Sequence, residues 1–382
     1  MLSRWKILDV EDNTLHAAGR IDVDPQGEFQ LEVKHLQTGS SQGVTTITLG
    51  NSECQVCVVP TRGMGIHHAD VGQWRVGWNA PVRGPVHPRL VPLMEPGGIG
   101  WLDGFDELLV RCGLTNNGAP VFTAGGQLQY PLHGRIANTP AYFVEACFDP
   151  ETEQLRLTGC VEESRLFHGK LRLTSTVTLS RGKAAVEIID EVTNISAEPG
   201  ELQLLYHVNF GPPLLETGSR MALTFSQMAP RDARAAEGTA HWNEYGTPEP
   251  GFAEQVYFFK PTADETGLCR AILRNAESSR AISLAFDPQQ LPCFSQWKSL
   301  QSEEDGYVTG LEPATNFPNP RPYEEKQGRV IALEPGETRT FDLALGFHQS
   351  RPTIQSLESN ICDAQAQSGF MIHESPQTGW SV

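Results

Sequence analysis

The chain has 382 residues, with 29 basic and 46 acidic side chains and a formal net charge of −17 at pH 7. This acidic balance argues against a nucleic-acid partner, because phosphate backbones are bound by neutralisation with Lys and Arg. No run approaches the roughly 20 apolar residues of a membrane-spanning helix, so we expect no membrane partner. The N-terminal sequence MLSRWK lacks the apolar region of a signal peptide, which predicts a cytoplasmic protein.

Short strands with turn residues between them dominate the pattern. We interpret residues 1–43 as an N-terminal extension that packs on one large domain over 44–382. β-branched runs over 44–49 and 55–59, and period-two alternation over 155–161, 171–179 and 185–192, are typical of strands. The sequence therefore predicts a mainly all-β protein with a large antiparallel β-sandwich and few short helices.

Two local features complete this interpretation. Residues 180–183 predict a hairpin, and residues 352–361 have apolar side chains at helical spacing after a Pro. Eight cysteines are scattered along the chain, and Cys54 and Cys57 match the pattern CxxC. Because no second pair and no helical pattern follow them, we expect buried free thiols and no metal or redox site.

Three residues can carry acid/base chemistry. Glu312 lies between a strand-like run and a segment rich in Pro and Asn, which predicts a loop position. His207 follows the strand-like run 202–206, and His133 lies in a segment punctuated by Gly and Pro. Imidazole titrates near neutral pH, and burial can raise the pKa of a carboxyl group. From the residues alone, a hydrogen-bonded core histidine and a solvated carboxylate remain open as alternatives.

These residues fall within a longer series of segments. The chain carries, in order, TITLGN (46–51), CVVPTRGMGI (57–66), His133-Gly134, His207-Val208-Asn209-Phe210, Leu311-Glu312-Pro313 and Leu333-Glu334-Pro335-Gly336-Glu337. The series covers about four-fifths of the chain and resembles the aldose 1-epimerase (galactose mutarotase) superfamily. Within it, WLDGFDELLVRCG (101–113) resembles the uncharacterised bacterial DUF4432 group.

The resemblance implies a galactose mutarotase-like sandwich that interconverts the anomers of a sugar without a cofactor or a metal. It implies Glu312 as general base, His207 as general acid and His133 as a ligand for a substrate hydroxyl. Its partner would be a small-molecule carbohydrate, bound by a monomer or a homodimer. Asn209 stands where the family usually has tyrosine, which leaves the particular sugar open.

Further polar and aromatic residues near these motifs are candidates for substrate binding. They are Arg62, Asp103, Glu107, Arg111, Arg135, Glu254 and Trp297. Glu254 stands near the place of the family's substrate-binding Asp, and the Asn that usually accompanies the arginine is missing beside Arg62. Alternatives are an exposed ion-paired turn for 103–111, a surface ion pair for Arg135 and packing for Trp297.

Two other functions remain open at this stage. The same groups could isomerise or eliminate from an oxidised sugar, with a metal held by the two histidines and the glutamate. Alternatively, the chain could be a carbohydrate-binding or regulatory module without turnover, since one fold hosts many functions.

Overall fold

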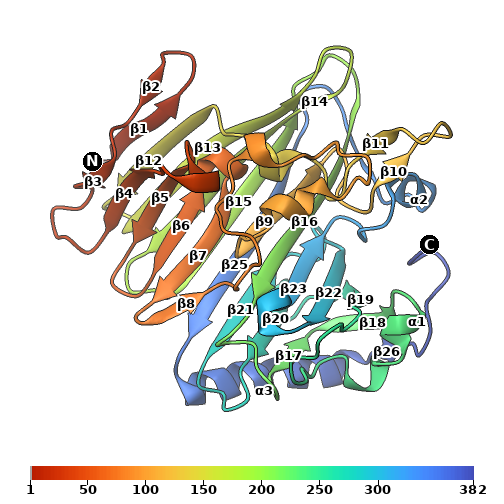
Figure 1. Ribbon diagram of the computed structural model, residues 1–382. Coiled ribbons are helices and arrows are strands. Elements are labelled where there is room, and N and C mark those ends of the chain that lie inside the picture. Colours follow the sequence, from red (N-terminus) through yellow and green to blue (C-terminus); the bar gives the residue numbers. More distant parts are fainter. Residues whose placement is uncertain (1) are drawn as a thin grey trace.

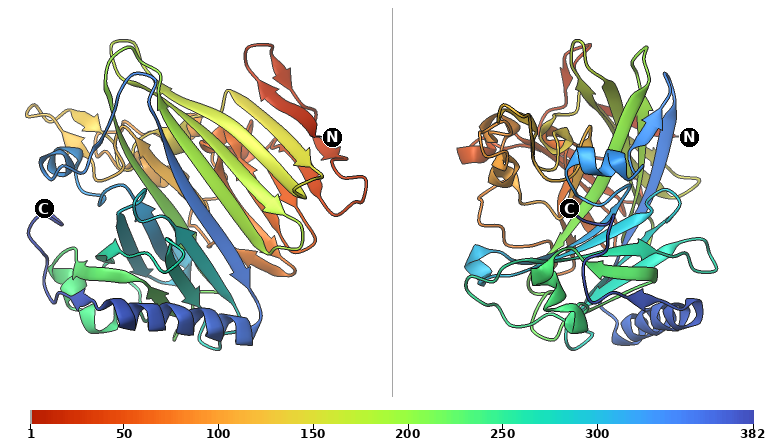
Figure 2. Two further views of the ribbon diagram at one scale, coloured as in Figure 1. Left: turned by 180° about the vertical axis from the view of Figure 1, so that it is seen from behind. Right: turned by 90° about the vertical axis from the view of Figure 1, so that its right-hand side faces the viewer.

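Two large, mainly antiparallel sheets packed face to face form the body of the protein, which the computed structural model describes over residues 2–382 (Figures 1 and 2). The first sheet has ten strands in the order β17 (Arg220–Leu223), β20 (Cys269–Arg274), β21 (Ala281–Phe286), β25 (Thr338–His348), β15 (Ala185–Asn194), β14 (Lys170–Ser180), β13 (Gln154–Ser164), β12 (Phe143–Asp149), β1 (Ser3–Asp9) and β2 (Thr14–Leu15). The expected antiparallel β-sandwich is confirmed.

The second sheet has fourteen strands and carries the candidate site. Its order is β26 (Met371–Ile372), β18 (Phe225–Pro230), β19 (Gln255–Pro261), β22 (Cys293–Leu300), β23 (Tyr307–Ala314), β16 (Gly200–Phe210), β9 (Leu109–Leu114), β7 (Gly65–Val71), β6 (Gln55–Val59), β5 (Thr45–Gly50), β4 (Gln30–His35) and β3 (Gly19–Ile21), with β24 (Ile331–Leu333) on β16 and β8 (Trp74–Val76) on β7. A small sheet pairs β10 (Val121–Phe122) with β11 (Leu128–Tyr130).

Helices are few in the described residues and lie outside the sandwich. They are α1 (Ala233–Ala236), α2 (Arg321–Lys326) and α3 (Arg351–Ser368). The helix expected over 352–361 is confirmed in α3, which is longer and runs along the lower edge of the molecule in Figure 1. Ile354 and Ile361 fix it by packing on Ile272 and Ala281 of the first sheet. None of the helices over 2–382 has the length and apolarity needed to cross a membrane.

Buried and partly exposed side chains alternate along β13 of the first sheet. In β13, Leu155, Leu157 and Val161 are buried, while Arg156 and Thr158 are partly exposed. This period of two is what a strand with one covered face requires. The hairpin expected at 180–183 is confirmed, since it joins β14 to the antiparallel β15.

The N-terminal segment contributes strands to both sheets. β1 pairs with β12 at one edge of the first sheet, and β3 and β4 extend the second sheet beyond β5. The thiols of Cys54 and Cys57 are free and buried, as expected, and burial raises the pKa of each to about 11.

Strand β16 is buried on both faces. Tyr206, Val208 and Phe210 point into the core between the sheets, whereas Leu205 packs with Trp101 on the opposite face. Alternation along a strand therefore directs His207 to the same face as Leu205, away from the core of the sandwich. Consequently β16 does not alternate between apolar and polar residues, because neither face meets solvent.

A buried ion pair connects the two sheets. Arg111 of β9 contacts Asp190 of β15 through two guanidinium nitrogens, and the Tyr206 hydroxyl donates to the same carboxylate at 2.8 Å. The guanidinium also donates to the Met64 carbonyl at 2.7 Å and to Ser175 Oγ at 2.8 Å. With both charges hydrogen-bonded, the cost of removing them from water is offset only while the pair is complete.

We expect Asp190→Asn to lower the free energy of unfolding by about 3–5 kcal/mol, because it leaves the Arg111 charge buried without a counter-ion. Urea unfolding followed by fluorescence would measure the loss. Glu187→Gln is the matched control, since Glu187 lies on the same strand with an exposed side chain and should change stability by less than about 1 kcal/mol. Equal effects from the two substitutions would contradict a structural role for the pair.

Candidate active site

The strand register brings His207 and Glu312 together. The pairs Leu205–Ala314 and Val208–Leu311 of β16 and β23 bracket them, so the same register sets His207 directly opposite Glu312. Side chains in such positions have Cβ atoms about 4.5–5.5 Å apart. His207 Nε2 lies 3.2 Å from Glu312 Oε1, and both side chains are almost completely buried. We call these two residues the dyad.

The loop position expected for Glu312 is wrong, because Glu312 lies within β23 and is paired on both sides. The local sequence Glu-Pro-Ala-Thr-Asn resembles a turn, but pairing with β16 and β22 overrides it. His207 lies within β16, three residues before its end, and His133 lies in a loop between β11 and the 3₁₀-helix η5 (Ile136–Asn138), where the sequence predicted it.

Asn209 fixes the tautomer of His207. The Asn209 amide nitrogen donates to the backbone carbonyls of Glu107 at 3.0 Å and of His207 at 3.2 Å. Its Oδ1 must therefore accept, and the partner at 2.6 Å is His207 Nδ1. It follows that Nδ1 carries a hydrogen and that Nε2 is the nitrogen that faces Glu312.

The surroundings of the dyad favour its neutral form, in which one proton lies between the two groups. Burial, assisted by the nearby His133, lowers the pKa of His207 to about 3. Burial also raises the pKa of Glu312 well above its ordinary value; Glu254 adds to this effect and Arg231 opposes it. Both shifts favour the uncharged forms, because low surrounding polarity disfavours both charges, and in the uncharged pair Glu312 is the donor to Nε2.

Gly310 makes room for this contact. It lies two residues before Glu312 in β23 and opposite Asn209 in β16. A Cβ at position 310 would lie 2.6 Å from Glu312 Oε1 and 3.0 Å from His207 Cε1. Any side chain here would push one or both members of the dyad aside.

Aromatic rings surround the His207 imidazole. The ring centroids of Phe105, Trp297 and His133 lie 5.1, 5.4 and 5.6 Å from that of His207. Trp101 lies 6.2 Å away and packs edge-on to His133 at 4.7 Å. These four residues form what we call the aromatic wall, which excludes water from the dyad and so accounts for its shifted pKa values.

His133 also has a defined orientation. Its Nδ1 donates to the Asn117 carbonyl at 2.8 Å, which leaves Nε2 for another partner. Burial lowers the pKa of His133, so the ring is neutral and Nε2 is an acceptor. The charge of Glu254 acts on the pKa of both His133 and Glu312, which places Glu254 near the two groups.

Glu254 lies at the exposed rim of the site. Its carboxylate accepts from Trp297 Nε1 at 2.7 Å and pairs with Arg231 at 2.9 Å. The structure therefore brings five of the sequence candidates together. His207 and Glu312 form the dyad, and His133, Glu254 and Trp297 lie around it.

Arg62 and Glu107 form a buried pair behind the aromatic wall. Arg62 Nε donates to Glu107 at 2.5 Å, and its other nitrogens donate to Asn138 Oδ1 and to the carbonyls of Val86 and Gly104. The backbone carbonyl of Glu107 accepts from Asn209. These two residues therefore support the segment that orients His207 and do not contact the dyad.

The other candidates lie away from the dyad. Arg111 points to the opposite face of the sheet, toward Asp190. Asp103 is exposed at the 3₁₀-helix η4 (Gly100–Gly104), and Arg135 contacts Met94 Sδ at 3.4 Å. The exposed ion-paired turn considered for 103–111 is wrong, since Glu107 and Arg111 are completely buried.

Three neighbours of the dyad lie in sequence patterns that do not indicate a functional site. Ser295 lies opposite Glu312 on β22, and its buried hydroxyl has no hydrogen-bond partner in the described residues. Gly310 and Arg231 were also missed. A serine or glycine within a strand is unremarkable until the neighbouring strand is known.

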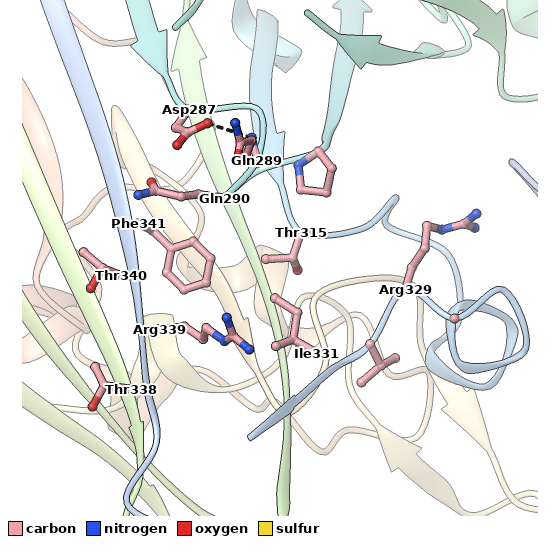
Figure 3. Close-up of a pocket in the computed structure, with 13 residues that line it drawn as sticks. Asp287, Gln289, Gln290, Thr315, Arg329, Ile331, Thr338, Arg339, Thr340 and Phe341 are labelled. Atoms are coloured by element: carbon pink, nitrogen blue, oxygen red, sulfur yellow. Dashed lines mark hydrogen bonds between the residues drawn. The ribbon is translucent and has the colours of Figure 1, made fainter. Parts of the chain in front are cut away.

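One further cavity lies away from the dyad. Its volume is about 630 Å³, and it lies between β25, the loop that follows α2 and the β21–β22 connection. Asp287, Arg329 and Phe341 lie in its wall (Figure 3). It contains none of the candidate residues. Across residues 2–382, His, Cys, Asp and Glu side chains form no group of three or more that could hold a metal ion.

The fold is that of the galactose mutarotase-like sandwich proteins. A structure from Klebsiella pneumoniae, named "putative aldose 1-epimerase", is 32% identical over 98% of this chain and 99% of its own, with a TM-score of 0.93. A galactose mutarotase-like protein from Clostridium acetobutylicum is 12% identical, covers 85% of this chain and 99% of its own, and has a TM-score of 0.59. The second likeness concerns the fold alone.

The family follows from a direct match. Residues 41–347 match the model of a domain of unknown function, DUF4432, and the chain belongs to that family. No curated protein matches the chain. The resemblance expected from the sequence motifs is thus confirmed at the level of family and fold.

We expect Glu312→Gln to stabilise the protein increasingly as pH rises. The folded-state pKa of Glu312 is raised, so its protonated form contributes fully below the unfolded value of 4.5, and this contribution is lost as pH rises toward the folded pKa. An amide has no proton to lose and can donate to Nε2. The difference should grow by up to about 1.4 kcal/mol per pH unit.

Urea unfolding at pH 5, 6.5 and 8 would measure this trend. Glu187→Gln, at an exposed position, should show no comparable dependence on pH. A difference that stays constant or reverses between pH 5 and 8 would show that Glu312 is ionised in the folded protein.

Proposed function

We propose that the protein is an aldose 1-epimerase-like isomerase that interconverts the anomers of a sugar by general acid/base ring opening. The observation that supports this most is the buried dyad with one proton shared between His207 and Glu312. Ring opening removes a proton from one oxygen and adds one to another, which needs one acid and one base close together.

Ring opening uses the charged arrangement of the dyad. Transfer of the shared proton from Glu312 to His207 Nε2 creates a carboxylate and an imidazolium, which substrate hydroxyls near Glu312 would favour by donating to it. Glu312 then removes the proton from the anomeric hydroxyl while His207 protonates the ring oxygen. The bond from C1 to the ring oxygen breaks, and C1 becomes a carbonyl.

Ring closure uses the neutral arrangement. After opening, Glu312 is protonated and His207 is neutral, as in the resting protein. Rotation about C1–C2 presents the other face of the carbonyl, His207 removes the proton from the ring hydroxyl, and Glu312 returns one to the carbonyl oxygen. The proton count is the same at the end, so no cofactor or external proton donor is needed.

Substrate contact is assigned to the residues that line the approach to the dyad. The neutral His133 presents Nε2 as an acceptor for a sugar hydroxyl. Trp297 offers an aromatic face, and Glu254 accepts hydroxyl hydrogens at the rim. Glu107 and Arg62 act as positioning residues through Asn209, and the proposal gives Asp103, Arg111 and Arg135 no contact with substrate.

NMR exchange spectroscopy with a panel of aldoses, deoxysugars, uronic acids and keto-sugars tests the proposal. We expect faster exchange between anomers of at least one sugar, reduced about 10²–10⁴-fold by Glu312→Gln and by His207→Ala. Asp287→Asn, in the cavity of Figure 3, is a control that should leave exchange unchanged. Sugar binding without faster exchange would support a binding module instead, and no effect on any sugar would refute mutarotation.

Gly310→Ala tests the geometry of the dyad without replacing either of its two members. Its Cβ would meet both members of the dyad, so we expect exchange to fall by at least about tenfold, as one weakened acid/base step requires. Gly169→Ala is the matched control, because nothing lies within 4 Å of the added Cβ. Wild-type exchange rates in a folded Gly310→Ala protein would show that the close contact is not needed.

A further inference from the structure

A second cavity, of about 480 Å³, lies on the other side of Trp78 from the dyad. Its wall includes His67, Trp74, Arg75, Trp78, Asp106 and Arg280, from β7, β8, the segment before β9 and the β20–β21 turn. Its volume is in the range of small-molecule binding pockets. Asp106 belongs to the segment 101–113 that carries the family resemblance, but the proposed chemistry uses none of these six residues.

Asp106 has a buried carboxylate without a donor. The residue is 6% exposed, and neither carboxylate oxygen has a hydrogen-bond partner within residues 2–382. The imidazole of His67 lies beside it, but its Nε2 is 3.6 Å from Oδ2, beyond hydrogen-bond distance. Gly84 keeps space for this carboxylate, since a Cβ there would lie 1.7 Å from Oδ2. Burying such a group without hydrogen bonds is unfavourable, and a ligand that donates to it would remove the penalty.

Trp74 presents the complementary group. It is 3% exposed, and its Nε1–H has no acceptor within the described residues. The cavity wall therefore holds one buried acceptor and one buried donor that the protein itself does not satisfy. Trp78 adds a second indole, and aromatic rings of this kind pack against the apolar faces of sugars.

The charges around the cavity indicate the ligand. Arg280 disfavours a cation, whereas Arg75 is already paired with Asp70 at 3.0 Å, and the buried Asp106 carboxylate disfavours an anion. His68 is neutral, because burial lowers its pKa to about 4. A ligand that both donates and accepts hydrogen bonds without a charge of its own satisfies all of these groups. We propose that this cavity is a second carbohydrate-binding subsite, specific for a neutral sugar unit.

Trp78 connects this subsite to the dyad. Its ring packs on Phe105 at 4.9 Å, and Phe105 in turn packs on His207. Trp78 Nε1 donates to the Glu107 carbonyl at 3.2 Å, which also accepts from Asn209, the residue that orients His207. The subsite does not depend on turnover at the dyad, but a sugar bound there would contact Trp78, which packs on Phe105 of the aromatic wall.

Binding can be measured without turnover by using methyl α-D-glucopyranoside and methyl β-D-galactopyranoside as probes, since neither has a free anomeric hydroxyl. Saturation-transfer NMR titrations would compare the wild-type protein with Asp106→Asn and Trp74→Phe. We expect saturable binding of at least one probe, weakened at least about tenfold by Asp106→Asn and severalfold by Trp74→Phe, because the first replaces an acceptor oxygen with a donor and the second removes the indole N–H donor.

Two controls locate the bound sugar. Glu312→Gln disables the dyad and should leave this binding intact, and so should Asp287→Asn in the cavity of Figure 3. Thermal unfolding checks each variant; if Asp106→Asn fails to fold, Trp74→Phe decides. Binding that is unchanged by both cavity substitutions, or no saturable binding of either probe, would overturn the proposal. If the wild-type protein binds a probe but does not speed anomer exchange, the proposed function is contradicted and the subsite proposal stands.

Discussion

The burial of β16 on both faces is the constraint from which the rest of the site follows. A strand at the centre of the sandwich meets the core on one side and the aromatic wall on the other, so its buried polar side chains depend on partners inside the protein, which Gln203 lacks among the described residues. Tyr206 finds Asp190 and Arg111 on the core side. His207 finds Asn209 and Glu312 on the other side. One strand thus supports both the cohesion of the two sheets and the candidate chemistry.

The two faces of β16 differ in the charge state of the polar groups buried there. On the core side, the guanidinium of Arg111 and the carboxylate of Asp190 satisfy each other. Arg111 also donates to Ser175 and Tyr206 donates to Asp190, which completes a network that is stable as ions. The dyad has a single proton and fewer donors, so burial favours its neutral form. A carboxyl and an imidazole held near the point of proton transfer are suited to catalysis, at a cost in stability.

The backbone carbonyl of Glu107 joins several parts of the molecule. It accepts from Asn209, which orients His207, and from Trp78, which lines the second cavity. The Glu107 side chain is held by Arg62. The acidic and basic residues of this segment, which from sequence suggest contact with a sugar, are used instead to fix a loop against the sheet. The buried side chain of Glu107 is matched by Arg62 within the protein.

The sequence by itself determined the local pattern: alternating strands, the hairpin at 180–183, the terminal helix and the family motifs that contain His133, His207 and Glu312. Tertiary structure decided that Glu312 lies in a strand, that Arg111 and Glu107 are buried, and that Gly310 lies beneath the dyad. The reason is physical. Alternation depends on neighbours along the chain, whereas register and burial depend on which distant strand pairs with which, and that pairing sets the distance between His207 and Glu312.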